Sequence, residues 1–149
     1  MSLEKKINER IKESMLARDK RTLEALRAVK SAILLAKTEK GAGDELSETA
    51  ELQLLQRLVK QRKESADVYE SKGRTDLAEE ERFQMQVIEG FLPQQLSEDE
   101  VRKEVAAIIE ETGAESMKDM GRVMSVATKK LAGKADNKIF SVIVRDQLA

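Results

Sequence analysis

The sequence predicts an all-α protein with an N-terminal helical domain of about four helices, residues 1–92, and a small C-terminal three-helix domain, residues 93–149. Three observations support this fold class. One proline and seven glycines leave long uninterrupted stretches in a chain of 149 residues. Apolar residues recur every three or four positions, the spacing of one helix face. The chain is 40% hydrophobic but only 3% aromatic, which is typical of an aliphatic helical core.

The first two helices are predicted from apolar spacing. The positions that indicate a helix over 3–17 are Leu3, Ile7, Ile11 and Met15. Those that indicate a helix over 20–39 are Leu26, Val29, Ile33 and Ala36. The stretch GAGDELS at 41–47 carries two glycines and predicts a loop.

The next two helices are predicted from their ends. Ser47 is a suitable N-cap for a third helix, which Gly73 would close with a left-handed residue. Asp76 and Glu79 have the spacing of a capping box at the start of a fourth helix. Pro93 ends that helix because proline lacks an N–H and disfavours helical geometry in the residue before it. The boundary between the two domains is placed here.

The C-terminal domain carries the clearest capping signals. Ser97 and Glu100 predict a capping box for a helix near 97–112, which ends at Gly113. A second Ser-x-x-Asp box, Ser116 with Asp119, starts a helix near 116–132. Gly133 closes that helix.

The final segment, IFSVIV, is rich in β-branched residues and could form a strand. A strand here would have no partner, and Asp136 is well placed as an N-cap. We therefore predict a helix over about 137–147, in which Ile139, Val142 and Ile143 share one helix face.

The composition excludes several classes of chemistry. The chain has no cysteine and no histidine, so disulfides, thiolate catalysis and thiolate or imidazole zinc sites are excluded. Ser97 and Ser116 are caps, and no serine has the surroundings of a nucleophile. We expect no catalytic residue, no metal site and no cofactor. Acidic residues interrupt every apolar run, so we expect neither a signal peptide nor a membrane partner, and a cytoplasmic protein.

The net charge of −1 hides a segregated pattern. Residues 1–40 carry a net charge of +5, residues 41–117 carry −10, and residues 118–149 carry +4. A globally basic nucleic-acid binder is excluded, whereas a locally basic one is not.

A basic stripe is predicted on the sixth helix. At about 100° per residue, Lys118, Arg122 and Lys129 fall within about 40° of one another. They lie opposite an apolar face of Met120, Val123, Met124, Ala127 and Leu131. An ordinary solvated face is the alternative. We favour RNA binding because no acid stands at the stripe positions, and because cations continue past the glycine turn. The candidate RNA-binding residues are Lys118, Arg122, Lys129, Lys130, Lys134 and Lys138.

Aromatic residues indicate how RNA would be read. Base-specific binding of single strands generally uses stacking on exposed rings. Phe140 is the only ring in the last 57 residues, and its neighbours are apolar. We therefore favour a protein that recognises the phosphate backbone or the shape of RNA over one that recognises its bases.

Two stretches, FLPQQLSEDEV and DMGRVMSVATKKLAGKADNKIFSVIVRDQLA, resemble the tail domain shared by the YqeY proteins and the B subunit of the bacterial aminoacyl-tRNA amidotransferase. The upstream QRKESADVYESKGRTDLAEEE is similar to the N-terminal part of the stand-alone YqeY proteins. The resemblance covers nearly the whole chain and implies an all-α protein. It also brings the label of carbon–nitrogen ligase activity with glutamine as the amido-N-donor.

The resemblance implies tRNA contact at Lys118, Arg122, Lys129 and Lys134, because the tail domain helps the amidotransferase to hold tRNA. It implies no catalysis by this chain, which lacks both the large substrate-binding body of the B subunit and the amidase. The leading hypothesis is a non-catalytic module that binds tRNA or other structured RNA. The alternatives are a protein-interaction adaptor, docking through the acidic middle and the third helix, and an accessory part of a ligase.

Overall fold

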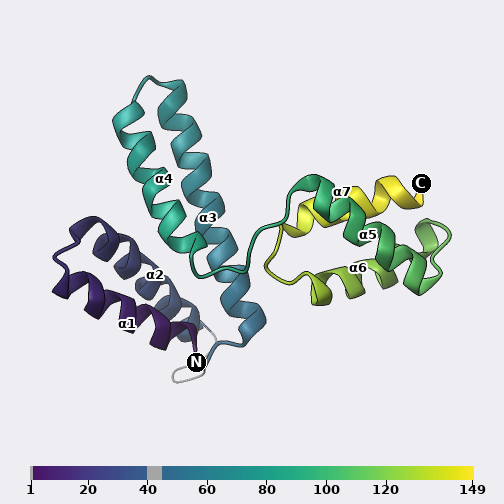
Figure 1. Ribbon diagram of the computed structural model, residues 1–149, viewed down its shortest axis with the longest axis horizontal. Helices are drawn as coiled ribbons and strands as arrows, with labels where there is room; N and C mark the ends of the chain where they lie inside the picture. Colours follow the sequence, from purple (N-terminus) through teal and green to yellow (C-terminus); the bar gives the residue numbers. More distant parts are fainter. Residues whose placement is uncertain (1, 40–44) are drawn as a thin grey trace. The chain divides into compact units, whose positions relative to one another are not determined.

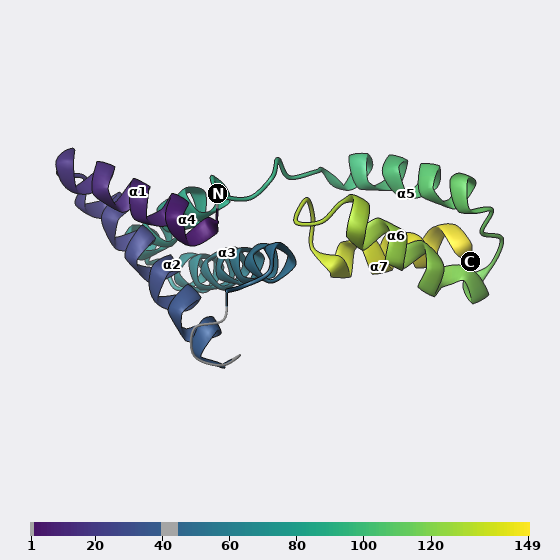
Figure 2. The same cartoon turned by 90° about the horizontal axis from the view of Figure 1, so that it is seen from below.

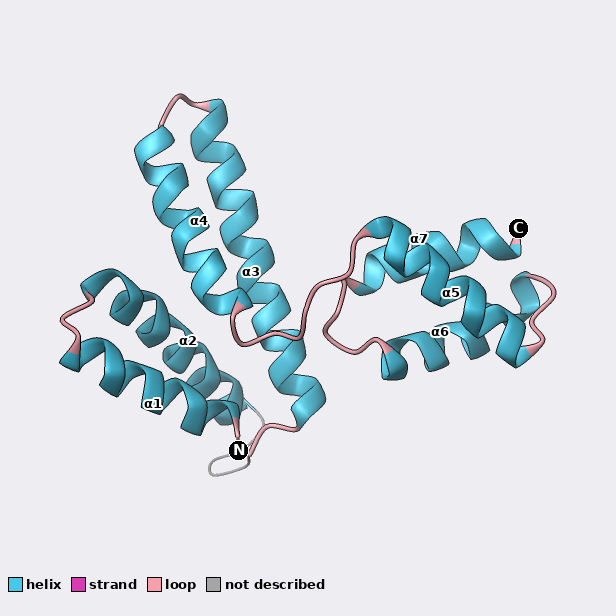
Figure 3. Cartoon of the chain, in the orientation of Figure 1, coloured by secondary structure: helices cyan, strands magenta, loops and turns pink. Residues whose placement is uncertain are grey.

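The computed structural model describes residues 2–39 and 45–149, which fold into α-helices and one 3₁₀ turn without strands (Figure 1, Figure 3). The helices are α1 (Leu3–Leu16), α2 (Lys20–Glu39), α3 (Glu48–Ser71), α4 (Thr75–Glu89), α5 (Glu98–Thr112), α6 (Met120–Lys130) and α7 (Asn137–Leu148). The 3₁₀ turn η1 spans Met117–Asp119. The predicted all-α class is confirmed.

The chain divides into two compact units, residues 1–92 and residues 93–149. Most of the loop predicted at 41–47 lies outside the described residues; residues 45–47 are non-helical and lead into α3. Within the described ranges, no helix combines the length and the apolar character needed to cross a bilayer.

The first unit consists of two helical hairpins, α1–α2 and α3–α4 (Figure 1, Figure 2). Helix α2 also contacts α3 and α4, so it joins the hairpins around one aliphatic core. The guanidinium of Arg21 in α2 lies 4.0 Å from the centre of the Phe83 ring and 3.0 Å from a Glu80 oxygen, both in α4. The buried core residues are Leu3, Ile7, Leu26, Val29, Ile33, Leu54, Leu55, Leu58 and Ile88.

The second unit is a three-helix bundle in which α5, α6 and α7 contact one another. Its largest fully buried side chain is Phe140, which belongs to a core that is otherwise aliphatic. Leu131 follows α6 and is 3% exposed, as the predicted apolar face of the sixth helix requires. IFSVIV is part of α7, so the prediction of a helix over a strand is confirmed.

Most of the predicted helix ends are confirmed. The Ser47 and Asp136 side chains accept hydrogen bonds from first-turn N–H groups, and Ser97 forms the full capping box with Glu100. The three predicted closing glycines all have positive φ: Gly73, Gly113 and Gly133. The capping box at Asp76 is wrong. Helix α4 begins one residue earlier and has no side-chain cap, and the Asp76 carboxylate lies 3.4 Å from the Arg74 guanidinium.

The residues predicted to share one face of α7 are not all buried. Ile139 and Val142 are 40% and 54% exposed, whereas Phe140 and Val144 are buried beside Ile143. Because nearly every residue of IFSVIV is apolar, the sequence indicates the helix without indicating its rotation. Packing of the large Phe140 ring into the bundle determines it.

Candidate nucleic-acid interface

The basic stripe lies on one exposed face of the second unit. Arg122 and Lys129 extend from α6 on the side opposite its buried residues, Val123 and Ala127. Lys118 is exposed too, but it belongs to the η1 turn before α6. The predicted separation of the basic and apolar faces is therefore present. The stripe begins on a turn instead of on a continuous helix.

The η1 turn replaces the capping box predicted from Ser116 and Asp119. The Ser116 hydroxyl accepts from the N–H of Lys118, and the Asp119 carboxylate accepts from the N–H of Glu115 at 2.9 Å. The hydrogen bond from Glu115 is the main reason that the pKa of Asp119 lies below its ordinary value. A stable carboxylate anion is thereby held at the start of α6.

The Asp119 carboxylate shows that one expectation from the sequence is wrong, because acidic side chains do lie beside the stripe. A guanidinium nitrogen of Arg122 lies 3.3 Å from an oxygen of Asp119. The Lys130 ammonium lies 3.8 Å from Glu111, which projects from the end of α5. Both pairs lie at the surface, where solvent screens them, so each contributes little to stability and its cation can exchange its partner for another anion.

The other four candidate cations differ from this pair. Within residues 2–39 and 45–149, no carboxylate oxygen lies within 4.0 Å of their ammonium nitrogens. These residues are Lys118, Lys129, Lys134 and Lys138. They can neutralise external anions without first losing an internal partner.

Lys134 is held in place by its backbone. It follows Gly133, whose φ of +74° allows the chain to reverse after α6. The carbonyl of Lys134 accepts a hydrogen bond from the N–H of Leu96 at 2.9 Å. The Gln95 side-chain amide donates to the carbonyls of Gly133 at 2.7 Å and Pro93 at 2.8 Å. The segment that enters α5 therefore fixes the turn that carries Lys134.

The sequence argument missed one cation, Arg145. It is exposed on α7 and lies seven residues after Lys138, which places both on the same helix face. Val142 lies between them on this face and is also exposed. The seven-residue spacing of Lys138 and Arg145 could have identified Arg145 from the sequence.

The chemistry of these side chains suits an extended polyanion. Lysine and arginine donate charge-assisted hydrogen bonds to phosphate oxygens, and these contacts fix the position of a nucleic acid without reading its sequence. In the part of the chain that the structure describes, no three acidic side chains group to hold a metal ion. The buried polar side chains described, Ser14 and Thr22, both lie in the first unit.

Fold and surface together define a class: an all-α protein of two compact units, with exposed cations along one helix of a three-helix bundle. The family model described as "Yqey-like protein" matches residues 4–148. The chain therefore belongs to the YqeY-like family, as its sequence motifs indicated. A search of curated proteins gave no match.

Proposed function

We propose that this protein is a non-catalytic module that binds structured RNA, with tRNA the first candidate, through the phosphate backbone. The observation that supports the proposal most directly is the exposed row of Lys118, Arg122 and Lys129, continued by Lys134 beyond the turn. The resemblance of this segment to a tRNA-contacting tail domain supports the same partner. The scarcity of exposed rings favours a reader of backbone and shape over a reader of bases.

The proposal predicts a strong dependence of binding on salt. Neutralising three or four phosphates releases a similar number of counterions, so log K should fall with log salt at a slope of about −2 to −4. Arg122→Glu with Lys129→Glu should abolish binding to tRNA, and the loss should be similar for tRNAs of different sequence. Both side chains are exposed, so the circular dichroism spectrum should stay nearly unchanged, and the melting midpoint should fall only slightly, through loss of the Arg122–Asp119 ion pair.

A matched control keeps the change in total charge the same. Lys63→Glu with Lys103→Glu alters two exposed lysines, on α3 and α5, outside the stripe. This control should lose much less affinity than the stripe variant. Equal losses would show that only the total charge matters, and unchanged binding by the stripe variant would show that the stripe is a solvated face.

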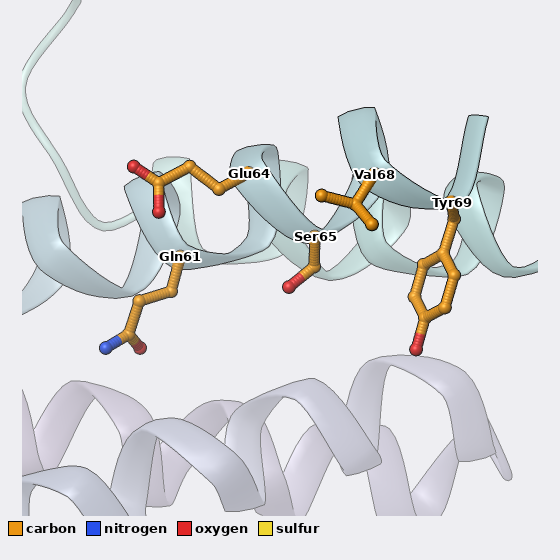
Figure 4. A pocket seen from close by; sticks show the side chains of 5 residues that line it. All are labelled: Gln61, Glu64, Ser65, Val68 and Tyr69. Carbon is orange, nitrogen blue, oxygen red and sulfur yellow. The ribbon is translucent and has the colours of Figure 1, made fainter. Parts of the chain in front are cut away.

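A second function, a protein-interaction adaptor, is favoured by a groove on α3. The groove has a volume of about 410 Å³ and is lined by Gln61, Glu64, Ser65, Val68 and Tyr69. Gln61, Ser65 and Tyr69 point to the same side of the helix (Figure 4). Val68 lies in the last turn of α3 and is 51% exposed, so it adds an apolar surface to the groove. An apolar contact with an adjacent carboxylate suits a protein partner better than it suits RNA.

Photo-crosslinking in cells separates the two functions. A photoreactive residue in place of Ser125, which is exposed between Arg122 and Lys129, samples the stripe. The same residue in place of Val68 samples the groove. RNA crosslinked at position 125 and little at position 68 would support the proposed function. Protein crosslinked at position 68, with no RNA at position 125, would establish the adaptor instead.

A further inference from the structure

The first unit is electrically divided between its two hairpins. Residues 2–39, which form α1 and α2, carry ten basic and six acidic residues, a net charge of +4. Residues 45–92, which include α3 and α4, carry seven basic and eleven acidic residues, a net charge of −4. The unit as a whole is therefore close to neutral, while the α1–α2 hairpin is strongly positive.

Part of this positive charge forms a row along the outside of α1. Lys5 and Lys12 are seven residues apart, so they share one helix face and lie about 10 Å apart along the axis. That face is opposite the buried side of α1, which consists of Leu3, Ile7 and Ser14. Two further exposed cations follow α1 along the chain: Arg18 lies in the turn, and Lys20 is the first residue of α2. We call these four exposed residues the α1 row: Lys5, Lys12, Arg18 and Lys20.

The cations of the α1 row are not neutralised internally. Across the described residues, none of the four has a carboxylate oxygen within 4.0 Å. Other cations of the hairpin do have such partners: Arg10 pairs with Glu13, Arg21 with Glu80 and Lys37 with Glu4.

Two acids lie close to the α1 row. The Asp19 carboxylate accepts hydrogen bonds from the Thr22 hydroxyl at 2.7 Å and from the Thr22 N–H at 3.2 Å, so it serves as the cap of α2. Glu9 is exposed and lies between Lys5 and Lys12 in sequence. With both Glu9 and Asp19 included, the α1 row still carries a net charge of +2.

We propose that the α1 row is a second phosphate-binding surface, so that structured RNA is contacted by both units of the chain. This inference takes its class of partner from the proposed function, but it concerns residues of the other unit. RNA is favoured because the row presents cations at intervals along a helix, as phosphate tracking requires. Its apolar neighbours, Met15 and Leu16, lie only at one end.

The test measures tRNA binding by the full chain over a salt series. Lys5→Glu with Lys12→Glu removes two contacts, which should flatten the log–log slope by about 1.4–1.8. Lys63→Glu with Lys103→Glu makes the same change in total charge elsewhere and should leave the slope unchanged. Glu9→Gln removes the acid within the row and should tighten binding by about 1.4- to 5-fold, the range expected for one exposed charge pair.

The stripe variant separates this inference from the proposed function. If the Arg122→Glu, Lys129→Glu variant loses binding while the Lys5→Glu, Lys12→Glu variant binds like the parent, then the stripe binds tRNA and the α1 row does not. If the reverse is found, the α1 row binds tRNA and the stripe does not. If Glu9→Gln weakens binding, or if the row variant loses affinity for anionic lipid vesicles and none for tRNA, the α1 row does not bind RNA.

Discussion

Leu131 and Lys129 are two residues apart and lie on opposite sides of the end of α6. Leu131 is buried and packs in the core of the second unit, whereas Lys129 is exposed. Leu131→Ala should lower the free energy of unfolding by about 2–5 kcal/mol, since it removes buried methyl groups and leaves a cavity. Lys129→Ala should lower it by less than about 0.5 kcal/mol. Urea midpoints measure both changes; equal midpoints would contradict this orientation of α6.

Carboxylates at helix starts should make the protein sensitive to acid. The Ser97 N–H donates to the Glu100 carboxylate at 3.0 Å and lowers the pKa of Glu100, and the Glu115 N–H does the same for Asp119. In the unfolded chain these groups take up protons at a higher pH, so unfolding is favoured as the pH falls. Their stabilisation should be complete above about pH 4.3 and lost as the pH drops through the lowered folded values.

Urea midpoints between pH 7 and pH 2.5 test this expectation. Stability should change little from pH 6 to pH 8, because the chain has no histidine or cysteine to titrate there. Glu100→Gln should reduce the acid-dependent part of the loss. A maximum of stability near pH 3 would contradict the assignment.

The residue types of the stripe could be predicted, but their pairing could not. Helical periodicity places Arg122 and Lys129 on the exposed face, because that face depends only on spacing. The ion pair of Arg122 with Asp119 depends on the η1 turn, where the chain leaves α-helical geometry. The pair of Lys130 with Glu111 depends on the packing of α6 against α5. The periodicity of a single helix carries no information on the turn before it or on its packing against another helix.

At the scale of helices, two glycines offer a paired test. Gly113 closes α5 with a φ of +68°, where a side chain is strained although nothing lies within 4 Å of an added Cβ. Gly113→Ala should cost about 1–2 kcal/mol. Gly121 lies in the first turn of α6 with equally open surroundings and no positive φ. Gly121→Ala should therefore stabilise the protein by about 0.5–1 kcal/mol. Thermal or urea unfolding distinguishes the two signs, and equal signs would contradict the argument.

The existence and ends of most helices follow from local sequence, whereas their rotation does not. Caps such as Ser97 and closing residues such as Gly133 act within a few residues, so the sequence alone indicates them. The inward face of α7 depends on which apolar side chains fill the bundle. Met15 shows the same limit: each four-residue step turns about 40° around the helix, so Met15 is 56% exposed although Ser14 in the same turn is buried.

At the scale of the whole molecule, the two units are each nearly neutral. Residues 1–92 carry eighteen basic and eighteen acidic residues, and residues 93–149 carry nine and ten. Long-range attraction of a polyanion is therefore small, and binding must rely on local surfaces such as the stripe. Affinity for RNA should be modest and should decline steeply with salt.

The proposed function also predicts an outcome for catalysis. The purified chain should neither release ammonia from glutamine nor amidate mischarged tRNA, because the sequence has no histidine or cysteine to serve as general base or nucleophile. An ammonia-release assay and an amidation assay, each with and without ATP, measure this. Activity that persists through repeated purification, and is lost when one residue of this chain is substituted, would contradict the prediction.

The hydrogen bonds of Gln95 and Leu96 to the Gly133–Lys134 turn have a consequence for proteolysis. A protease must pull several residues of its substrate into an extended form, so cleavage beside Leu96 requires these hydrogen bonds to open first. A ligand that holds Lys134 would keep the turn closed and slow this cleavage. The rate at which a leucine-specific protease cuts at Leu96 would then report occupancy of a surface that is 38 residues away along the chain.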